Sequence, residues 1–274
     1  MKTRVITAVV LLPLLLLVVL AAPKIFTAIL FAAMAAVAAY ELLSGTGLVK
    51  HPRLWIYSCL SAFWCVLWSG LSIGHAWLLL GILLFWVAVF AEMMASDMKL
   101  GFEKCAVCFA GGVLLPLLFG AVVRLHAMEQ GRFFILIPFV LAFLSDTGAY
   151  FAGLKFGKHK LAPVISPKKT IEGVVGGVFG AIVGMVLYCL ILQAAFQFRV
   201  NYLYAVLYGI LGSAAGVFGD LCFSVIKRQT GIKDYGNLFP GHGGVLDRFD
   251  SMTVVAPLVE VLMLLLPVAV MTNG

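Results

Sequence analysis

The chain has 274 residues, of which 63% are hydrophobic and 11% are charged, and its mean hydropathy is +1.11. Soluble domains contain about 45–50% apolar and about 25% charged residues, so this composition excludes a soluble protein. Each membrane span needs about 20 apolar residues, and the length therefore leaves no room for a separate soluble domain. The net charge of +7 bears first on membrane topology, and we expect no nucleic-acid partner.

Nine apolar runs, separated by charged, Gly or Pro clusters, predict an all-α polytopic membrane protein with about nine transmembrane helices. The first two runs are joined only by Pro23 and Lys24, so eight spans is the alternative count. The first run has the charge-then-apolar order of a signal peptide. It exceeds the usual length of about 7–15 residues, and a second run follows at once, so we interpret it as a span and not as a cleaved leader. The predicted spans are 5–22, 25–43, 54–72, 76–95, 105–123, 133–154, 174–198, 202–223 and 251–271.

The basic residues predict a cytoplasmic N-terminus. In that orientation only Lys24, Arg124, Arg132 and Arg199, of 19 Lys and Arg residues, fall outside the cytoplasm. This bias follows the positive-inside rule. Without the loops after the sixth and eighth spans, six basic residues remain inside against four outside, a weaker bias of the same sign.

The chain is expected to comprise N-terminal transmembrane helices over 1–132 and a C-terminal catalytic region over 133–274. The catalytic region contains two cytoplasmic loops rich in polar residues, 155–173 and 224–250. Two such loops on one side of a membrane are candidates for a single site. The six cysteines lie in or beside apolar runs and predict no disulfide framework, and the isolated Cys105–Cys108 pair is interpreted as two small buried thiols.

Acidic residues inside apolar runs are costly and suggest function by default. Glu41 and Glu92 lie near the predicted cytoplasmic ends of their helices, where a helix-end role suffices. Glu260 lies well inside the ninth span, where a buried hydrogen-bonding role and a functional role are equally supported.

Asp220 differs because of the residues that follow it. Ser224, Lys227 and Arg228 come four, seven and eight residues later, which places all four on one helix face at the cytoplasmic boundary. A helix end whose basic side chains reach for water would explain the two cations. It would not explain the carboxylate beneath them.

The stretch "FPGHGGVLDRFD" joins a Pro-Gly turn to His242, Gly243 and Gly244, and glycines allow close backbone approach to a ligand. Asp247, Arg248 and Asp250 follow. Carboxylates mixed with cations beside a glycine turn suit a polyphosphate bound with Mg²⁺, and they also suit two-metal phosphoryl or nucleotidyl transfer. The sequence contains no P-loop, so a nucleotide would be held in another way.

The loop after the sixth span supplies similar groups. Asp146 lies near the end of that span, and "SPKKTIEG" contributes Lys168, Lys169 and Glu172. The positive-inside rule explains the lysines as well as ligand binding does. His159 is interpreted as a surface residue and not as a ligand.

The second loop resembles the signature of the phosphatidate cytidylyltransferase family, also called CDP-diacylglycerol synthases. The match covers 27 residues without a departure and extends to the stretch 145–173, whereas the N-terminal spans match only in hydropathy. The matching residues are Ser224, Lys227, Arg228, Lys233, Asp234, Gly236, Phe239, Pro240, His242, Gly243, Gly244, Asp247, Arg248 and Asp250.

This resemblance implies transfer of the cytidylyl group of CTP to phosphatidic acid, giving CDP-diacylglycerol and pyrophosphate with Mg²⁺ and, as an open alternative, a second metal ion. It suggests Asp220 and Asp247 as metal ligands, since acidic side chains at two helix ends can converge. The residues expected to act in the reaction are Lys227, Arg228, Lys233, Asp234, His242, Arg248 and Asp250. Those expected to bind substrate are Ser224, Gly243, Gly244, Lys168, Lys169, Glu172 and Asp146, with Asp146 and Asp250 also candidates at the metal.

The expected partners are CTP, phosphatidic acid and membrane lipid, and a homodimer is an expectation from this class of enzyme. The expected location is a bacterial cell membrane, with the site facing the cytoplasm. Two alternatives stay open. One is a CTP-using enzyme that acts on another lipid, such as a polyprenol-type kinase or an archaeal-type lipid cytidylyltransferase. The other is a transporter whose Asp146, Asp220 and Glu260 form an ion path.

Overall fold

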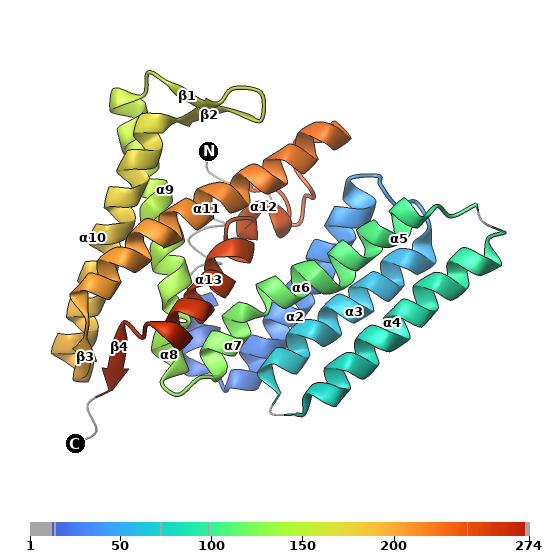
Figure 1. Cartoon of the computed structure of the whole chain (residues 1–274), viewed down its shortest axis with the longest axis horizontal. Helices are drawn as coiled ribbons and strands as arrows, with labels where there is room; N and C mark the ends of the chain where they lie inside the picture. The colour runs from blue at the N-terminus through green and yellow to red at the C-terminus, as the bar shows by residue number, and fades with distance from the viewer. Residues whose placement is uncertain (1–12, 14, 72, 98, 240, 272–274) are drawn as a thin grey trace. The chain divides into compact units, whose positions relative to one another are not determined.

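The computed structural model describes residues 13, 15–71, 73–97, 99–239 and 241–271, and nearly all of its elements are helices (Figure 1). Within these residues, six helices are long and apolar enough to cross a membrane. The prediction of an all-α, multi-pass membrane protein is therefore confirmed. Half of the first predicted span lies outside the described residues, as do Lys2 and Arg4, and the count of nine spans stays a prediction.

The chain folds into two compact units. The first contains Met1–Ala127 and Lys227–Phe249, and the second contains Met128–Ile226 and Asp250–Gly274. The predicted division after residue 132 grouped the segment 224–250 with the C-terminal helices. In the compact units, most of that segment belongs with the N-terminal helices.

The first unit is a bundle of helices in which α3 packs against α2, α4 and the π-helical turn η2. The fifth predicted span is divided into three short α-helices by the π-helical turn η2 and by Gly120. The elements are α2 (Lys24–Tyr40), η1 (Glu41–Gly45), α3 (Pro52–Gly70), α4 (His75–Ala95), α5 (Phe102–Phe109), η2 (Ala110–Leu114), α6 (Leu115–Phe119), α7 (Ala121–Ala127) and α12 (Leu246–Phe249).

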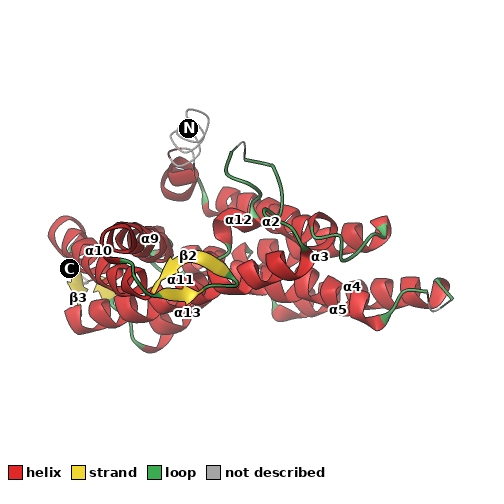
Figure 2. Cartoon of the chain, turned by 90° about the horizontal axis from the view of Figure 1, so that it is seen from above, coloured by secondary structure: helices red, strands yellow, loops and turns green. Residues whose placement is uncertain are grey.

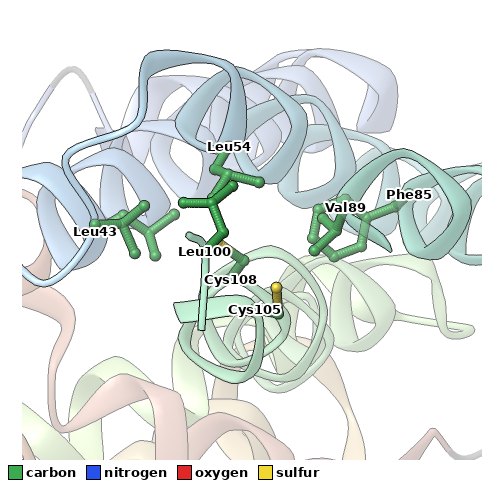
Figure 3. Packing of buried hydrophobic residues seen from close by; sticks show 8 residues of the cluster. Leu43, Leu54, Phe85, Val89, Leu100, Cys105 and Cys108 are labelled. Atoms are coloured by element: carbon green, nitrogen blue, oxygen red, sulfur yellow. The ribbon is translucent and has the colours of Figure 1, made fainter. Parts of the chain in front are cut away.

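A buried apolar cluster joins these helices near the loop that follows α4 (Figure 3). Its thiols come from Cys105 and Cys108, which are free and buried, so the interpretation of this pair as small buried thiols is confirmed. The cluster consists of Leu43, Val49, Leu54, Phe85, Val89, Leu100, Cys105 and Cys108.

Three aromatic rings fix α12 within the first unit. The centre of the Phe249 ring lies 6.3 Å from that of Phe31 in α2 and 5.6 Å from that of Phe119 in α6. The ring centres of Phe31 and Phe119 are 5.5 Å apart. Edge-to-face pairs at such distances are stabilising beyond the area they bury. They tie the end of the 227–249 segment to helices from the start of the chain.

The second unit is built around α9, which packs along α10 and also contacts α13. Two small antiparallel pairs accompany the helices: β1 with β2, drawn in yellow in Figure 2, and β3 with β4. The elements are α8 (Gly131–Phe134), α9 (Leu136–Phe156), β1 (Lys160–Ala162), β2 (Ser166–Thr170), α10 (Ile171–Phe196), β3 (Phe198–Val200), α11 (Tyr202–Thr230), whose last turn belongs to the first unit, α13 (Met252–Leu265) and β4 (Ala269–Met271).

The ninth predicted span, 251–271, is shorter than expected. Its helix α13 ends at Leu265, and the chain continues as strand β4, paired with β3. The backbone carbonyls freed by this ending have partners: Asn201 N–H donates to Val268 O at 2.9 Å, and the Tyr208 hydroxyl donates to Leu266 O at 3.1 Å. An apolar sequence can therefore leave the helical conformation here without exposing unpaired polar groups.

The contact between α9 and α10 depends on glycine. A Cβ added to Gly148 would clash with the carbonyl oxygen of Gly176, and one added to Gly180 would clash with that of Leu144. Missing side chains of this kind let two membrane helices approach closely.

Gly148→Ala is expected to destabilise the protein by about 1–3 kcal/mol, because overpacking against a backbone oxygen outweighs the better helix propensity of Ala. Gly216→Ala is the matched control on α11, where the nearest atom to an added Cβ lies 3.6 Å away. Thermal denaturation in detergent should show a lower midpoint for the first variant only. Equal midpoints would contradict the packing argument.

Candidate active site

The part of the signature that belongs to the first unit, residues 227–249, is called the signature segment here. Asp247 lies at the centre of its contacts. Its side chain is 2% exposed, and its Oδ1 atom lies 3.0 Å from the Lys227 ammonium. Its Oδ2 atom accepts hydrogen bonds from the backbone N–H of Tyr235 at 2.7 Å and of Gly244 at 3.0 Å. One carboxylate thus joins the end of α11, the middle of the segment and the turn before α12.

Lys227 is held from two sides. Besides its ion pair with Asp247, its ammonium group lies 5.4 Å from the centre of the Tyr235 ring, a cation–π distance. Its side chain is only 13% exposed. Removing either partner would leave the other as a buried charge without its counterion, which costs about 3–5 kcal/mol.

The glycine turn is tight. Phe239 N–H donates to Gly243 O at 2.9 Å, and His242 N–H donates to Phe239 O at 2.8 Å, with Pro240 between them outside the described residues. Gly243 has φ +87°, and a Cβ placed there would lie 2.8 Å from Asp247 Oδ2. Only glycine meets both conditions at this position.

The remaining charges of the segment lie on its surface. Four charged residues lie close in sequence to Lys227 and Asp247, and the side chain of each is exposed. The segment therefore buries one charged pair as its framework and presents further charges to a ligand. These exposed residues are Arg228, Lys233, Asp234 and Arg248.

Glu41 is a residue that the sequence-based interpretation missed. It was assigned a helix-end role, but its carboxylate is buried and accepts the N–H groups of Val245 at 3.0 Å and Leu246 at 2.8 Å. The available signal was its position, an acidic residue inside an apolar run. Nothing in the sequence indicated a partner more than 200 residues away.

In the second unit, Lys169 and Asp220 form an ion pair, with side chains 26% and 32% exposed. Lys169 comes from strand β2 of the 155–173 loop, and Asp220 lies on α11. Ser224, one turn further along α11, places its Oγ atom 3.5 Å from Asp220 Oδ1, at the long limit of a hydrogen bond. The first polar loop thus reaches α11 at its one acidic residue, while the neighbouring Lys168 is exposed.

Asp250 lies beside the same part of α11. A Cβ added to Gly219 would lie 3.0 Å from the Asp250 carbonyl oxygen, so the start of α13 passes close to the residue before Asp220. The Asp250 carboxylate accepts the N–H of Ser251 at 2.7 Å, and its carbonyl accepts the hydroxyl of Thr253 at 2.7 Å. Two of the predicted acidic residues therefore belong to one region of the second unit.

Glu172 has a local role in the polar loop. Its carboxylate accepts the N–H groups of Lys158 at 3.1 Å and of His159 at 3.2 Å, and His159 Nδ1 lies 2.6 Å from it. The His159 side chain is 74% exposed, as its interpretation as a surface residue requires. Asp146 is exposed on α9, about three turns before that helix ends.

The two predicted metal ligands differ in how well they fit Mg²⁺, which prefers carboxylate oxygens free to turn toward it. At Asp247, three hydrogen-bond donors already occupy the two oxygens, one of them a lysine ammonium. Asp220 is more exposed and lies near Asp250. Among the described residues, no three His, Cys, Asp or Glu side chains gather in a metal-binding group, and the assignment of both ligands stays a prediction.

A cavity of about 420 Å³ lies between α3 and α4 of the first unit. Its walls are largely apolar, with two tryptophans, and the predicted site residues do not line it. The lining residues are Tyr57, Leu60, Ser61, Trp64, Trp77, Leu80, Gly81, Leu84, Phe85 and Ala88.

Comparison with known proteins gives a family. A family model described as the cytidylyltransferase family matches residues 2–266. A phosphatidate cytidylyltransferase of Bacillus subtilis is 34% identical over 274 residues, covering 97% of this chain and 98% of that protein. Proteins of the same name from Staphylococcus epidermidis and Staphylococcus aureus are each 38% identical, over 176 and 181 residues. Each of these alignments covers 64% of this chain and 65% of the staphylococcal protein.

Proposed function

The chain belongs to the cytidylyltransferase family, and we propose that it transfers the cytidylyl group of CTP to phosphatidic acid in phospholipid synthesis. The products are CDP-diacylglycerol and pyrophosphate. The observation that carries the proposal is the folded signature segment. There the buried pair of Asp247 and Lys227 holds the backbone, while Arg228, Lys233 and Arg248 stay exposed to a polyanionic ligand.

The chemistry needs no protein nucleophile. A phosphate oxygen of phosphatidic acid attacks the α-phosphorus of CTP, the bond to the β-phosphate breaks, and pyrophosphate leaves with the electron pair. The reactants carry several negative charges, so the main tasks of the protein are positioning and charge neutralisation. The exposed cations of the signature segment are the groups proposed for this task, and Lys168 and Lys169 are proposed to add positive charge from the polar loop.

Mg²⁺ is proposed as the cofactor, with Asp220 and Asp247 as its ligands and Asp250 and Asp146 as further candidates. The ion would neutralise the triphosphate and the leaving pyrophosphate. The carboxylate oxygens of these residues are the hard donors that Mg²⁺ prefers. At Asp247 the ion would have to compete with Lys227. The number of metal ions is left open in this proposal.

The substrates favour a site at the cytoplasmic surface of a bacterial cell membrane. Phosphatidic acid presents its head group at the membrane surface, and CTP is a cytosolic nucleotide. The excess of basic residues in the segments assigned to the cytoplasm supports the same orientation. A homodimer is proposed only by analogy with other membrane enzymes of this class.

Purified protein with phosphatidic acid, Mg²⁺ and CTP labelled at the α-phosphate is expected to form a labelled lipid and an equal amount of pyrophosphate. Chelation with EDTA should stop the reaction, and added Mg²⁺ should restore it. Label that enters the lipid only from the γ-phosphate would identify a lipid kinase instead. Solute flux through liposomes without CTP, and no labelled lipid, would favour the transporter alternative.

A further inference from the structure

Glu41 is a buried acidic residue for which the proposed chemistry has no use. It begins the π-helical turn η1 at the end of α2, and it is 4% exposed. Its two carboxylate oxygens take different partners: Oε1 accepts the N–H of Val245 at 3.0 Å, and Oε2 accepts that of Leu246 at 2.8 Å. Burial of a carboxylate is costly unless hydrogen bonds compensate it, so these two bonds are strong and specific.

The glycines of the signature segment make room for this carboxylate. A Cβ added to Gly236 or to Gly244 would clash with the carboxylate of Glu41, and one added to Gly45 would clash with the carbonyl oxygen of Tyr235. Turn η1 and the segment therefore fit each other at three places. A π-helical turn widens a helix locally, and such turns are frequent at functional sites.

We propose that Glu41 is a positioning residue for the active site, which holds the backbone at 244–246 and thereby orients Asp247. The next link is direct, because Asp247 pairs with Lys227 and accepts the N–H groups of Tyr235 and Gly244. Glu41 acts through these contacts and not on the substrates. The inference deepens the proposed function and rests on it for the reaction that is measured.

Glu41→Gln is the sharpest substitution. The two side chains have the same shape, but an amide offers one oxygen and one NH₂ group. It can accept only one of the two backbone N–H bonds, and its NH₂ group must face the other donor. Glu92→Gln is the matched control in the same unit, because the Glu92 carboxylate pairs with Arg53 at 3.2 Å on α3.

In the full-length protein, Glu41→Gln is expected to speed amide hydrogen exchange in peptides covering 241–249 by about tenfold or more. The kcat should fall by about tenfold, and the KM for CTP should rise by about fivefold, because the segment no longer presents its cations in place. The control Glu92→Gln should match the wild type in exchange rate, in kcat and in KM. A partly unfolded enzyme would differ, since loss of folded molecules lowers the apparent kcat and leaves KM unchanged.

A wild-type KM and wild-type exchange at 241–249 in Glu41→Gln would overturn the inference. Faster exchange throughout the first unit with an unchanged KM would overturn it too, because that pattern belongs to a structural role alone. If Glu41→Gln does not fold, Gly244→Ala tests the same contact from the other side by placing a methyl group against the carboxylate. Its matched control is Gly101→Ala, where an added Cβ meets nothing within 4 Å.

Gly244→Ala is expected to reproduce the faster exchange at 241–249 and the higher KM, whereas Gly101→Ala should not. Wild-type values in Gly244→Ala would contradict the inference. Failure of the wild-type protein to form a CDP-lipid is a separate result, because it would refute the proposed function. The exchange rates would still decide whether Glu41 holds the segment.

Discussion

Asp247→Asn is expected to lower the rate of CDP-diacylglycerol formation by at least about a hundredfold. An Asn side chain keeps the shape of Asp but replaces one acceptor oxygen with a donor. If its oxygen faces the N–H groups of Tyr235 and Gly244, its NH₂ group faces the Lys227 ammonium. If it turns the other way, it meets the two N–H groups with a donor. Either orientation leaves buried donors unpaired, at a cost of about 3–5 kcal/mol when a charge loses its partner.

The measurement is the initial rate of lipid labelling from α-labelled CTP, together with the unfolding midpoint. Asp97→Asn is the control, because Asp97 has φ 52° in a loop, a conformation that Asn also adopts readily. The double variant Asp247→Asn with Lys227→Met should lose much less stability than the sum of the losses in the two single variants, because the pair is removed together. Full additivity would show that the ion pair does not act as a unit.

The single variant Asp247→Asn also separates two possible roles for Asp247. If the residue only organises the segment, the Mg²⁺ concentration that gives half-maximal rate should stay close to the wild-type value. If it binds the ion, that concentration should rise by about tenfold or more, since a ligand charge is lost. The proposed ligand role requires the second result, and an ion at Asp247 would have to displace the Lys227 ammonium from Oδ1.

Asp220→Asn is expected to reduce the rate by about a hundredfold, through the loss of the one negative charge on α11. The variant can keep its contact with Ser224 but leaves Lys169 without its opposite charge. If Asp220 binds Mg²⁺, half-maximal rate should need about tenfold more of the ion. Lipid labelling across a series of Mg²⁺ concentrations gives both quantities.

Lys169→Gln tests the other half of this ion pair and should lower the rate by about tenfold, less than Asp220→Asn, because a partly exposed pair is weak and the Asp220 carboxylate remains. Lys160→Gln is the control on strand β1 of the same hairpin, where the side chain is exposed. Wild-type rates in Asp220→Asn would refute the proposed role of this carboxylate. An effect of Lys160→Gln as large as that of Lys169→Gln would refute the specificity of the pair.

The helices were predictable because each long apolar run has only one way to satisfy its backbone in a membrane. The end of α13 was missed because the residues from 266 to 271 are apolar like the helix before them, although Pro267 is a local signal that a helix ends. Leu266, the residue before Pro267, leaves the helical region at φ −137° and ψ 66°. The pairing with β3 and the hydroxyl of Tyr208, which come from elsewhere in the chain, then satisfy the backbone beyond it. Local sequence carries no signal for partners of this kind.

The candidate site residues show the same division. The spacing of Asp220 and Ser224 on one helix face was readable, because helical periodicity is local. The role of Glu41 was not, since it depends on how turn η1 meets a segment about 200 residues later. The glycines at 236 and 244 were noticed as part of a motif, but the group that needs the space beside them is visible only in the structure.

The length of α11 has a consequence for where the reaction can occur. Its 29 residues span about 44 Å at about 1.5 Å per residue, whereas the hydrocarbon layer is about 30 Å thick. If the helix enters that layer at Tyr202, about nine residues remain beyond it, and these begin just after Asp220. On the same condition, Asp220 would lie at the far edge of the hydrocarbon layer, next to the lipid head groups, and Lys227 and Arg228 would extend beyond it toward water.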